Sequence, residues 1–289
     1  MIKKVFLHIG IFFLQLLSFL PLWFLLGIAN ILYYLIYDVV GYRRKVVRKN
    51  LHQSFPEKSI SEIIKIEKRF YRNLTDIMVE IIKMNSISKA EVLKRVKMKN
   101  FELAEDYFKR GESALACTGH YGNWELCMMA VGLKFSAKPY VIYKPINNKV
   151  FENWFNALRT KFGNIFVPMK QTLREVVATK TATTLFCFAS DQSPRGRDAH
   201  HILTFLNQPT AVLLGLEKIA LQTNRPIFYF EVKRIKRGYY EIECIPMCLN
   251  PKETEKFEIT EQFFEHLTKT IEKEPGDWLW SHRRWKINE

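Results

Sequence analysis

The chain has 289 residues, enough to bury a domain-sized core, and its 48% hydrophobic and 25% charged residues exclude an intrinsically disordered protein. Its formal net charge of +15 predicts an anionic partner, for which nucleic acid, an anionic membrane surface and an acidic carrier protein are the candidates. The five cysteines are an odd number and lack the spacing of a zinc site, so we expect neither a disulfide framework nor a metal, and a reducing compartment fits best.

The first predicted element is an apolar stretch, residues 5–39, in which Asp38 is the only charge. As one helix it would measure about 50 Å, longer than the roughly 30 Å hydrocarbon core of a bilayer, and Pro21 divides it into two halves. Its length and the lack of a small-residue cleavage site disfavour a signal peptide. We expect a membrane anchor over residues 1–40, with a buried core helix as the alternative, and one domain over residues 41–289.

A basic cluster, residues 43–49, follows the apolar stretch and holds five cations in seven residues. Beside an anchor, such a cluster predicts contact with anionic headgroups and a cytoplasmic location for the domain that follows. A solvated helix face is the alternative. Because Lys3 and Lys4 place positive charge at the other end, the sequence leaves open whether the anchor spans the membrane once or lies in its plane as a helical hairpin.

The elements after the basic cluster follow from local signals. Ser59 and Glu62 have the spacing of a capping box, which predicts a helix to about Lys83 with an apolar stripe at three- and four-residue steps. A second helix is expected at about 100–110. From there short apolar strands alternate with helices, which predicts an α/β domain with a mainly parallel central sheet and functional groups at the carboxyl ends of its strands. The expected strands are 113–118, 140–143, 165–167, 184–188, 227–233 and 239–245, the last two as a hairpin, and the expected helices are 124–133, 149–162, 173–179, 211–223 and 258–273.

The main chemical motif is the segment 118–125, where an apolar strand turns into a helix. Its two glycines permit a tight turn, and Asn123 is placed to cap the helix. With His120 in the loop and Glu125 in the first helical turn, the carboxylate is within reach of the imidazole and would fix its tautomer. We interpret His120 as a general base for an acceptor hydroxyl or amine, with backbone N–H groups at the helix start holding an oxyanion or a phosphate. A structural histidine is the alternative.

Three motifs that would indicate a nucleophilic serine or a nucleotide-binding site are absent from the sequence. The chain has no G-x-S-x-G nucleophile elbow, no phosphate-binding G-x-x-x-x-G-K-[ST] and no G-x-G-x-x-G. A base without a resident nucleophile indicates direct transfer from an activated donor.

The sequence resembles a known family at this motif. His120 and Glu125 resemble the H-x4-D/E motif of glycerolipid acyltransferases, and their context is similar to the lipid A late acyltransferases, the lauroyl and myristoyl transferases. The resemblance covers nearly the whole chain, in an ordered series that is more specific than the motif alone. After the apolar N-terminal stretch the series is Arg48-Lys49-Asn50-Leu51, Phe55-Pro56, the histidine motif, Tyr143-Lys144-Pro145, Arg159, Asp191-Gln192 and Trp280-x-His282-Arg283-Arg284-Trp285-Lys286.

The resemblance implies catalytic roles for four residues. His120 would be the general base and Glu125 its partner, and Arg159 and Asp191 would also serve activity. Arg159 suits a phosphate or an active-site carboxylate, and Asp191, which follows the strand 184–188, is expected at the same sheet edge as His120. A surface arginine and a turn aspartate are the alternatives. The terminal basic segment is an anion site or packs its tryptophans with its cations in solvent. The substrate contacts that we expect are Asn123, Lys144, Gln192, Arg283 and Arg284.

The implied activity is transfer of a fatty acyl chain from an acyl thioester, on acyl carrier protein or CoA, to a hydroxyl or amine of a membrane lipid. A lipid A precursor at the cytoplasmic face of the inner membrane is the first acceptor to consider, without metal, organic cofactor or nucleic acid. Phe205-Leu206-Asn207 stands where the family usually has an aromatic-aromatic-Gly segment, which leaves the acceptor open. A phosphatidylinositol mannoside or aminolipid acceptor, a non-catalytic membrane- or nucleic-acid-binding protein, and a thioesterase are the alternatives.

Overall fold

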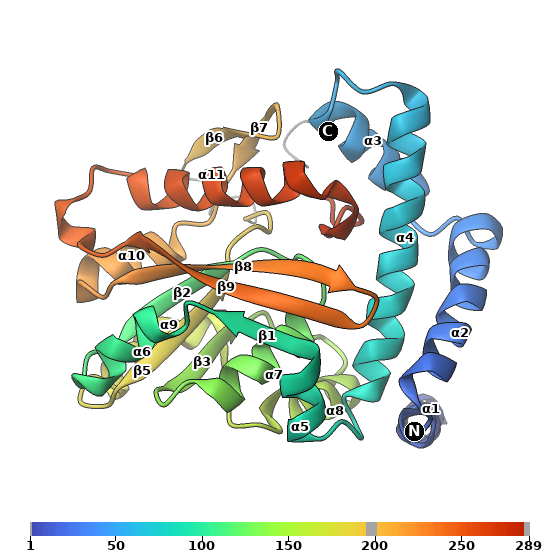
Figure 1. Cartoon of the computed structure of the whole chain (residues 1–289), viewed down its shortest axis with the longest axis horizontal. Helices are drawn as coiled ribbons and strands as arrows, with labels where there is room; N and C mark the ends of the chain where they lie inside the picture. The colour runs from blue at the N-terminus through green and yellow to red at the C-terminus, as the bar shows by residue number, and fades with distance from the viewer. Residues whose placement is uncertain (1, 195–200, 286–289) are drawn as a thin grey trace.

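A seven-stranded sheet forms the centre of the computed structural model, which describes residues 2–194 and 201–285 (Figure 1). The strand order is β1-β9-β8-β2-β5-β3-β4, and β8 and β9 form an antiparallel hairpin while the other neighbouring pairs are parallel. The predicted α/β class with a mainly parallel sheet is therefore confirmed. The strands are β1 (Val96–Lys99), β2 (Ala114–Thr118), β3 (Lys138–Tyr143), β4 (Ile165–Pro168), β5 (Thr184–Ala189), β8 (Ile227–Lys236) and β9 (Tyr239–Cys248), with β6 (Ile202–Phe205) and β7 (Gln208–Ala211) as a separate pair.

Helices cover both faces of the sheet. α11 lies across one face and α7 and α8 lie on the other, while the long α4 stands beside the β8–β9 turn (Figure 1). α4 begins at a capping box, as predicted, because the Ser59 and Glu62 side chains bind each other's backbone N–H groups. The helices of the domain are α3 (Arg44–Ser54), α4 (Ile60–Lys83), α5 (Lys89–Arg95), α6 (Glu102–Lys109), α7 (Trp124–Lys134), α8 (Lys149–Thr160), α9 (Thr172–Ala178), α10 (Gly215–Thr223) and α11 (Glu258–Lys273).

Several short elements differ from the sequence prediction. The region before β2 contains α5 and β1, which have seven and four residues and offer too few turns or alternations for a periodic signal. The predicted helix at 211–223 begins only at Gly215, because Ala211 closes β7 of the small β6–β7 hairpin. That hairpin reverses at Leu206 and Asn207, which both have positive φ values.

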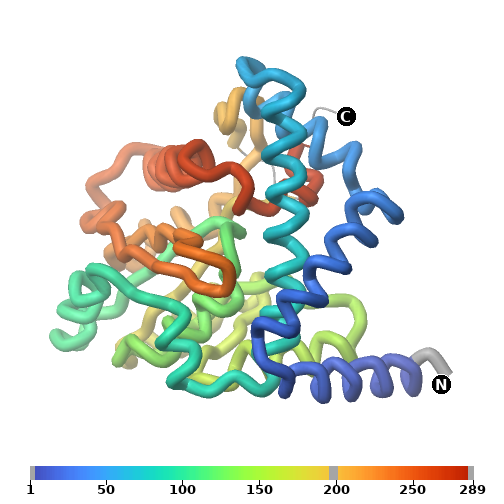
Figure 2. Tube along the Cα trace, turned by 45° about the vertical axis from the view of Figure 1, so that its right-hand side comes forward, coloured from blue at the N-terminus to red at the C-terminus, as the bar shows by residue number. Residues whose placement is uncertain are grey.

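The apolar N-terminal stretch forms two helices, α1 (Ile2–Ser18) and α2 (Leu22–Tyr34), that meet near Pro21. α2 packs along the outer side of α4, and α1 extends outward from the lower end of α2 (Figure 2). The helical stretch Leu22–Val39 is long and apolar enough to cross a membrane, and only 22% of it is buried in the protein. One face of each helix therefore belongs to the protein and another lies open.

The hydrophobic core brings two loops together at one edge of the sheet. β2 and β5 are parallel neighbours, fully buried along most of their length, and Thr118 at the end of β2 pairs with Ala189 at the end of β5. The residues that follow each strand, Gly119-His120 and Ser190-Asp191, therefore leave the sheet side by side. This register places the candidate site.

Candidate active site

The turn that carries His120 depends on its two glycines. A Cβ on Gly119 would lie 2.5 Å from Cδ1 of Leu267 on α11, so a larger residue would require the buried Leu267 side chain or the loop to shift. Gly122 has φ +55, a backbone conformation that residues other than glycine rarely adopt, and it lies against Val232 and Tyr240. The glycines thus let the chain leave β2, expose the imidazole and enter α7 within a few residues.

His120 is held by Asp191. The ring Nδ1 lies 2.5 Å from Oδ1 of Asp191, and the backbone N–H of His120 donates to Oδ2 of the same carboxylate at 2.8 Å. Because Nδ1 carries the proton shared with the carboxylate, Nε2 keeps the lone pair that a general base needs. The amide Nε2 of Gln192 lies 3.2 Å from that atom. The His120 side chain is 16% exposed, whereas that of Asp191 is 3% exposed, so the base lies at the surface above a buried carboxylate.

The electrostatics of the pair follow from burial and mutual attraction. Burial alone lowers the pKa of His120, but the charge and hydrogen bond of Asp191 outweigh it and raise that pKa above its ordinary value. Burial raises the pKa of Asp191, but His120 and the donors around the carboxylate lower it to about 2. Asp191 is therefore ionised over the physiological range and stabilises an imidazolium at His120.

The expected partnership of Glu125 with His120 is wrong. Glu125 instead forms a two-point ion pair with Arg159 of α8, whose Nε lies 2.8 Å from Oε2 and whose Nη2 contacts Oε1. The guanidinium also lies 3.8 Å from the ring centre of Phe155. The side chain of Glu125, in the first turn of α7, reaches across to α8, while Asp191 occupies Nδ1 of His120. Of the two tasks considered for Arg159, the structure shows the carboxylate pair.

Trp278, near the end of the chain, is a member of the site that sequence reasoning missed. Its indole Nε1 donates to Oδ2 of Asp191 at 2.9 Å, and the side chain is buried. The segment around it lies antiparallel to the histidine turn: Tyr121 pairs with Trp278, and the N–H of Leu279 donates to the carbonyl of His120 at 3.1 Å. Trp278 lies two residues before the terminal motif that the resemblance covers, and no spacing signal singles it out among six tryptophans.

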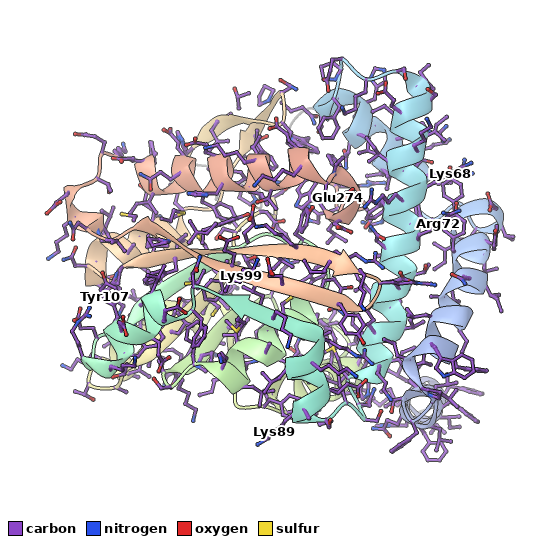
Figure 3. The ribbon with its side chains drawn as sticks, viewed as in Figure 1. Lys68, Arg72, Lys89, Lys99, Tyr107 and Glu274 are labelled. Carbon is purple, nitrogen blue, oxygen red and sulfur yellow. The ribbon has the colours of Figure 1, made fainter. Side chains whose placement is uncertain are left out.

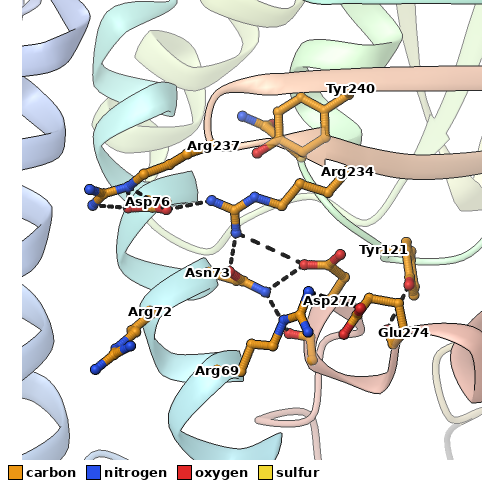
Figure 4. Close-up of polar contacts among 12 residues, drawn as sticks. Arg69, Arg72, Asn73, Asp76, Tyr121, Arg234, Arg237, Tyr240, Glu274 and Asp277 are labelled. Carbon is orange, nitrogen blue, oxygen red and sulfur yellow. Dashed lines mark hydrogen bonds and ion pairs between the residues drawn. The ribbon is translucent and has the colours of Figure 1, made fainter.

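A buried polar network ties this segment to α4 (Figure 4). Nδ2 of Asn73 donates to Oδ1 of Asp277 at 2.5 Å, and the backbone carbonyl of Asp277 accepts from the N–H of Gly122 at 2.9 Å. Arg234 lies between Asp277 and Asp76, with its Nη2 2.5 Å from Oδ2 of Asp76. Burial raises the pKa of Asp277 to about 6. α4 and the β8–β9 hairpin therefore hold the histidine turn from behind.

Asn123 caps α7, as predicted. Its Oδ1 accepts from the N–H of Leu126 at 2.9 Å, and its Nδ2 donates to Glu80 at 2.6 Å. The side chain is fully buried, so the expected substrate contact at Asn123 would require these bonds to open. The N–H groups of His120, Gly122 and Leu126 all have protein acceptors, so an oxyanion would bind other N–H groups at the start of α7, such as those of Trp124 and Glu125 in its first turn.

The other expected substrate contacts lie in three places. Gln192 lies at His120, and Lys144 is exposed in the loop between β3 and α8. Arg283 is exposed beside α3, whereas Arg284 is buried, donates to the carbonyl of Ala211 at 2.8 Å, and has no hydrogen-bond partner for Nε and Nη2 within the described residues. The basic segment thus both packs and presents charge. Lys286, the last residue of that motif, lies outside the described residues.

A comparison with protein families gives a match over nearly the whole chain. The family described as bacterial lipid A biosynthesis acyltransferase matches residues 1–287. A comparison with curated proteins gave no match.

Proposed function

We propose that this chain, which belongs to the bacterial lipid A biosynthesis acyltransferase family, transfers a fatty acyl chain from a thioester to a membrane lipid. The acceptor group is a hydroxyl or an amine, and His120 is the general base. The observation that carries the proposal is the geometry of His120. Nδ1 is bound to a buried carboxylate, and Nε2, on a side chain that is partly exposed, lies against the amide of Gln192. A lipid A precursor is the acceptor that the family supports, and a phosphatidylinositol mannoside or aminolipid is the alternative.

The reaction follows from the positions of these atoms. The acceptor hydroxyl replaces the amide of Gln192 at Nε2, gives its proton to that nitrogen and attacks the thioester carbonyl. The imidazolium is stabilised by Asp191. Donors at the start of α7 hold the oxyanion of the tetrahedral intermediate. Collapse breaks the carbon–sulfur bond, and the thiolate takes the proton from Nε2, so that an ester and a free thiol leave and the base is regenerated.

Arg159 and Glu125 support the site through their pairing. Their ion pair joins the first turn of α7 to α8, with the side chains 13% and 5% exposed. Because the histidine turn leads directly into α7, a shift of that helix would move the base and the oxyanion donors together. We assign the pair a positioning role, in place of direct contact with His120.

We further propose that α1 and α2 attach the protein to one leaflet of the membrane without crossing it. Arg237, which is bound to Asp76, donates to the carbonyl of Leu26 and to Oδ1 of Asn30, near the middle of the apolar stretch. Lys68 and Arg72 project from α4 on the side of α2 (Figure 3). A transmembrane α2 in this arrangement would bring these charges into the hydrocarbon, at a cost of about 2.5–3.5 kcal/mol or more for each.

The open faces of α1 and α2 supply the surface that would enter the bilayer. Large apolar side chains dominate these faces, and the exposed fractions are 73% at Trp23 and 71% at Ile31 of α2, with 75% at Phe19 in the turn between the helices. A reporter fused to the N-terminus distinguishes the geometries. If α1 and α2 lie in the membrane plane, protease added to one side of sealed vesicles cleaves both the reporter and the catalytic domain. If the apolar stretch spans the membrane once, one of the two is protected. Protection of the reporter alone would contradict this attachment.

The test of the activity is His120→Ala. We expect acyl transfer to lipid to fall by about 10²–10⁴, because general base catalysis contributes that much. His266→Ala is the matched control, since His266 lies on α11 and its ring stacks on Tyr229 of β8 with ring centres 5.0 Å apart. A His120→Ala variant with wild-type transfer rates would overturn the mechanism. Donor hydrolysis at the same rate with and without acceptor lipid would identify a thioesterase instead.

A further inference from the structure

A cationic region lies on α3, which does not belong to the His120 site. Lys45, Lys49 and Gln53 are spaced four residues apart and so form one stripe along the helix. The arginines of α3 are engaged elsewhere: Arg48 binds Glu67 of α4 at 2.8 and 2.9 Å, and Arg44 lies 3.5 Å from the same carboxylate. Within the described residues, these ion pairs attach α3 to α4 through its arginines and do not include Lys45.

The C-terminal segment forms the opposite wall. Buried Nδ2 of Asn50 donates to the carbonyls of Trp280 and His282 at 2.9 and 3.0 Å, and Arg43 donates to the carbonyl of Ser281 at 2.9 Å. These bonds hold the main chain against α3 and place Arg283 beside the stripe. The wall is thus fixed by buried hydrogen bonds.

A cavity of about 130 Å³ lies between the stripe and this wall. It adjoins a shallower hollow along α3 that adds Arg48 and His52, and neither hollow has a carboxylate among its lining residues in the described part of the chain. A water molecule occupies about 30 Å³, so the cavity has room for a tetrahedral oxyanion. Its lining residues are Lys45, Val46, Lys49, Asn50, Gln53, Arg283 and Trp285.

The walls of the cavity are joined through the chain to the apolar N-terminal stretch and, through Ser193, to the residues beside His120. α3 begins at Arg44, after a short turn that follows the exposed apolar residues Val39 and Val40 at the end of the apolar stretch. On the other side, the hydroxyl of Ser193 donates to the carbonyls of Arg283 and Arg284, and Ser193 is the residue after Gln192, which lies at His120. A lipid with its chains in the bilayer and a hydroxyl at His120 would pass this cavity.

We propose that this cavity, between α3 and the Arg283 segment, binds a phosphate group on the headgroup of the acceptor lipid. The proposal rests on the proposed function and adds to it the part of the acceptor that is recognised. Lys45 on one wall and Arg283 on the other supply charge, and Gln53 supplies an amide donor, a set that suits a phosphate better than an uncharged sugar. The small volume favours a single phosphate over an acidic helix of a carrier protein, which would need a broad surface.

The test compares acceptors and charge variants of the full-length protein in neutral detergent micelles, which removes bulk membrane charge. The variant Lys45→Gln/Arg283→Gln removes one cation from each wall. We expect its KM for a phosphorylated glycolipid acceptor to rise at least about tenfold at constant acyl-CoA, since the loss of a charge-assisted contact is worth that much. Its KM for the same acceptor without phosphate should equal that of the wild type.

The control variant Lys89→Gln/Lys97→Gln removes the same charge at exposed residues of α5 and β1. Lys89 is labelled in Figure 3, and Figure 1 shows that α5, to which it belongs, lies far from α3. Equal KM ratios for the two acceptors in the wild type and the Lys45/Arg283 variant would overturn the proposal. So would a KM that rises only for acyl carrier protein as donor, which would assign the cavity to the carrier.

Equilibrium dialysis of the phosphorylated glycolipid in the same micelles needs no turnover and separates the two proposals. If the wild type binds the phosphorylated lipid and the Lys45/Arg283 variant does not, the cavity is supported even when no transfer is found and the proposed enzyme function fails. If both bind equally, the cavity proposal fails whatever the activity.

Discussion

Trp278→Phe removes one donor from Asp191 and leaves the rest of the site in place. Trp278 Nε1 lies 2.9 Å from Oδ2, which also accepts from the backbone N–H of His120. Phenylalanine keeps most of the buried ring but cannot donate. A hydrogen bond to a charged group contributes about 1.5–3 kcal/mol. Because Asp191 keeps its other donors, we take the lower value, which corresponds to a fall of about tenfold in kcat/KM.

The same substitution has a second effect, on the pH dependence. His120 must be neutral to act as a base, so kcat/KM rises as pH passes its pKa, which Asp191 holds above the ordinary value. Without the indole donor the carboxylate is more basic and holds the imidazolium more tightly. If about half of the 1.5 kcal/mol reaches His120, the acid limb moves up by about half a pH unit.

The assay is the pH profile of kcat/KM for acyl transfer, with Trp280→Phe as the matched control. Trp280 is equally buried, but its Nε1 donates to the carbonyl of Pro275 at 2.6 Å. The control should lose stability without moving the acid limb. If Trp278→Phe lowers the rate while its limb coincides with that of the wild type, the indole acts only through packing and the reasoning fails.

Two further predictions concern the ion pairs. Asp191→Asn should lower kcat/KM by about 10⁴ and move the acid limb to lower pH, because the carboxylate that raises the pKa of His120 is gone. The same pH profile checks both effects, and an unmoved limb would contradict the pairing. Glu125→Gln should cost about 3–5 kcal/mol of the free energy of unfolding, because it leaves Arg159 largely buried without a counter-ion, and Glu125→Gln/Arg159→Met should recover part of it in urea titrations. Loss of activity in Glu125→Gln with unchanged stability would instead assign Glu125 to the chemistry.

The elements that the sequence predicts well are those with a long periodic signal or a capping residue. The capping box at Ser59 and Glu62 sets the start of α4, and the predicted α11 range 258–273 agrees with the structure. β1 alternates two apolar with two charged residues, Val96-Lys97-Met98-Lys99, and such a short edge strand is stabilised by pairing with β9, which local sequence does not encode. Local patterns therefore identify the scaffold, whereas long-range pairing decides the short elements.

The partners of His120 show the same division. Glu125 is the carboxylate nearest in sequence, and the spacing allows it to reach His120, but spacing says nothing about what else competes for either group. Asp191 lies 71 residues away and reaches His120 because β2 and β5 are parallel neighbours in register. Arg159 then draws Glu125 toward α8. The H-x4-E motif therefore marks two ion pairs, one at the end of the sheet and one between helices, and the sheet register determines which carboxylate serves the base.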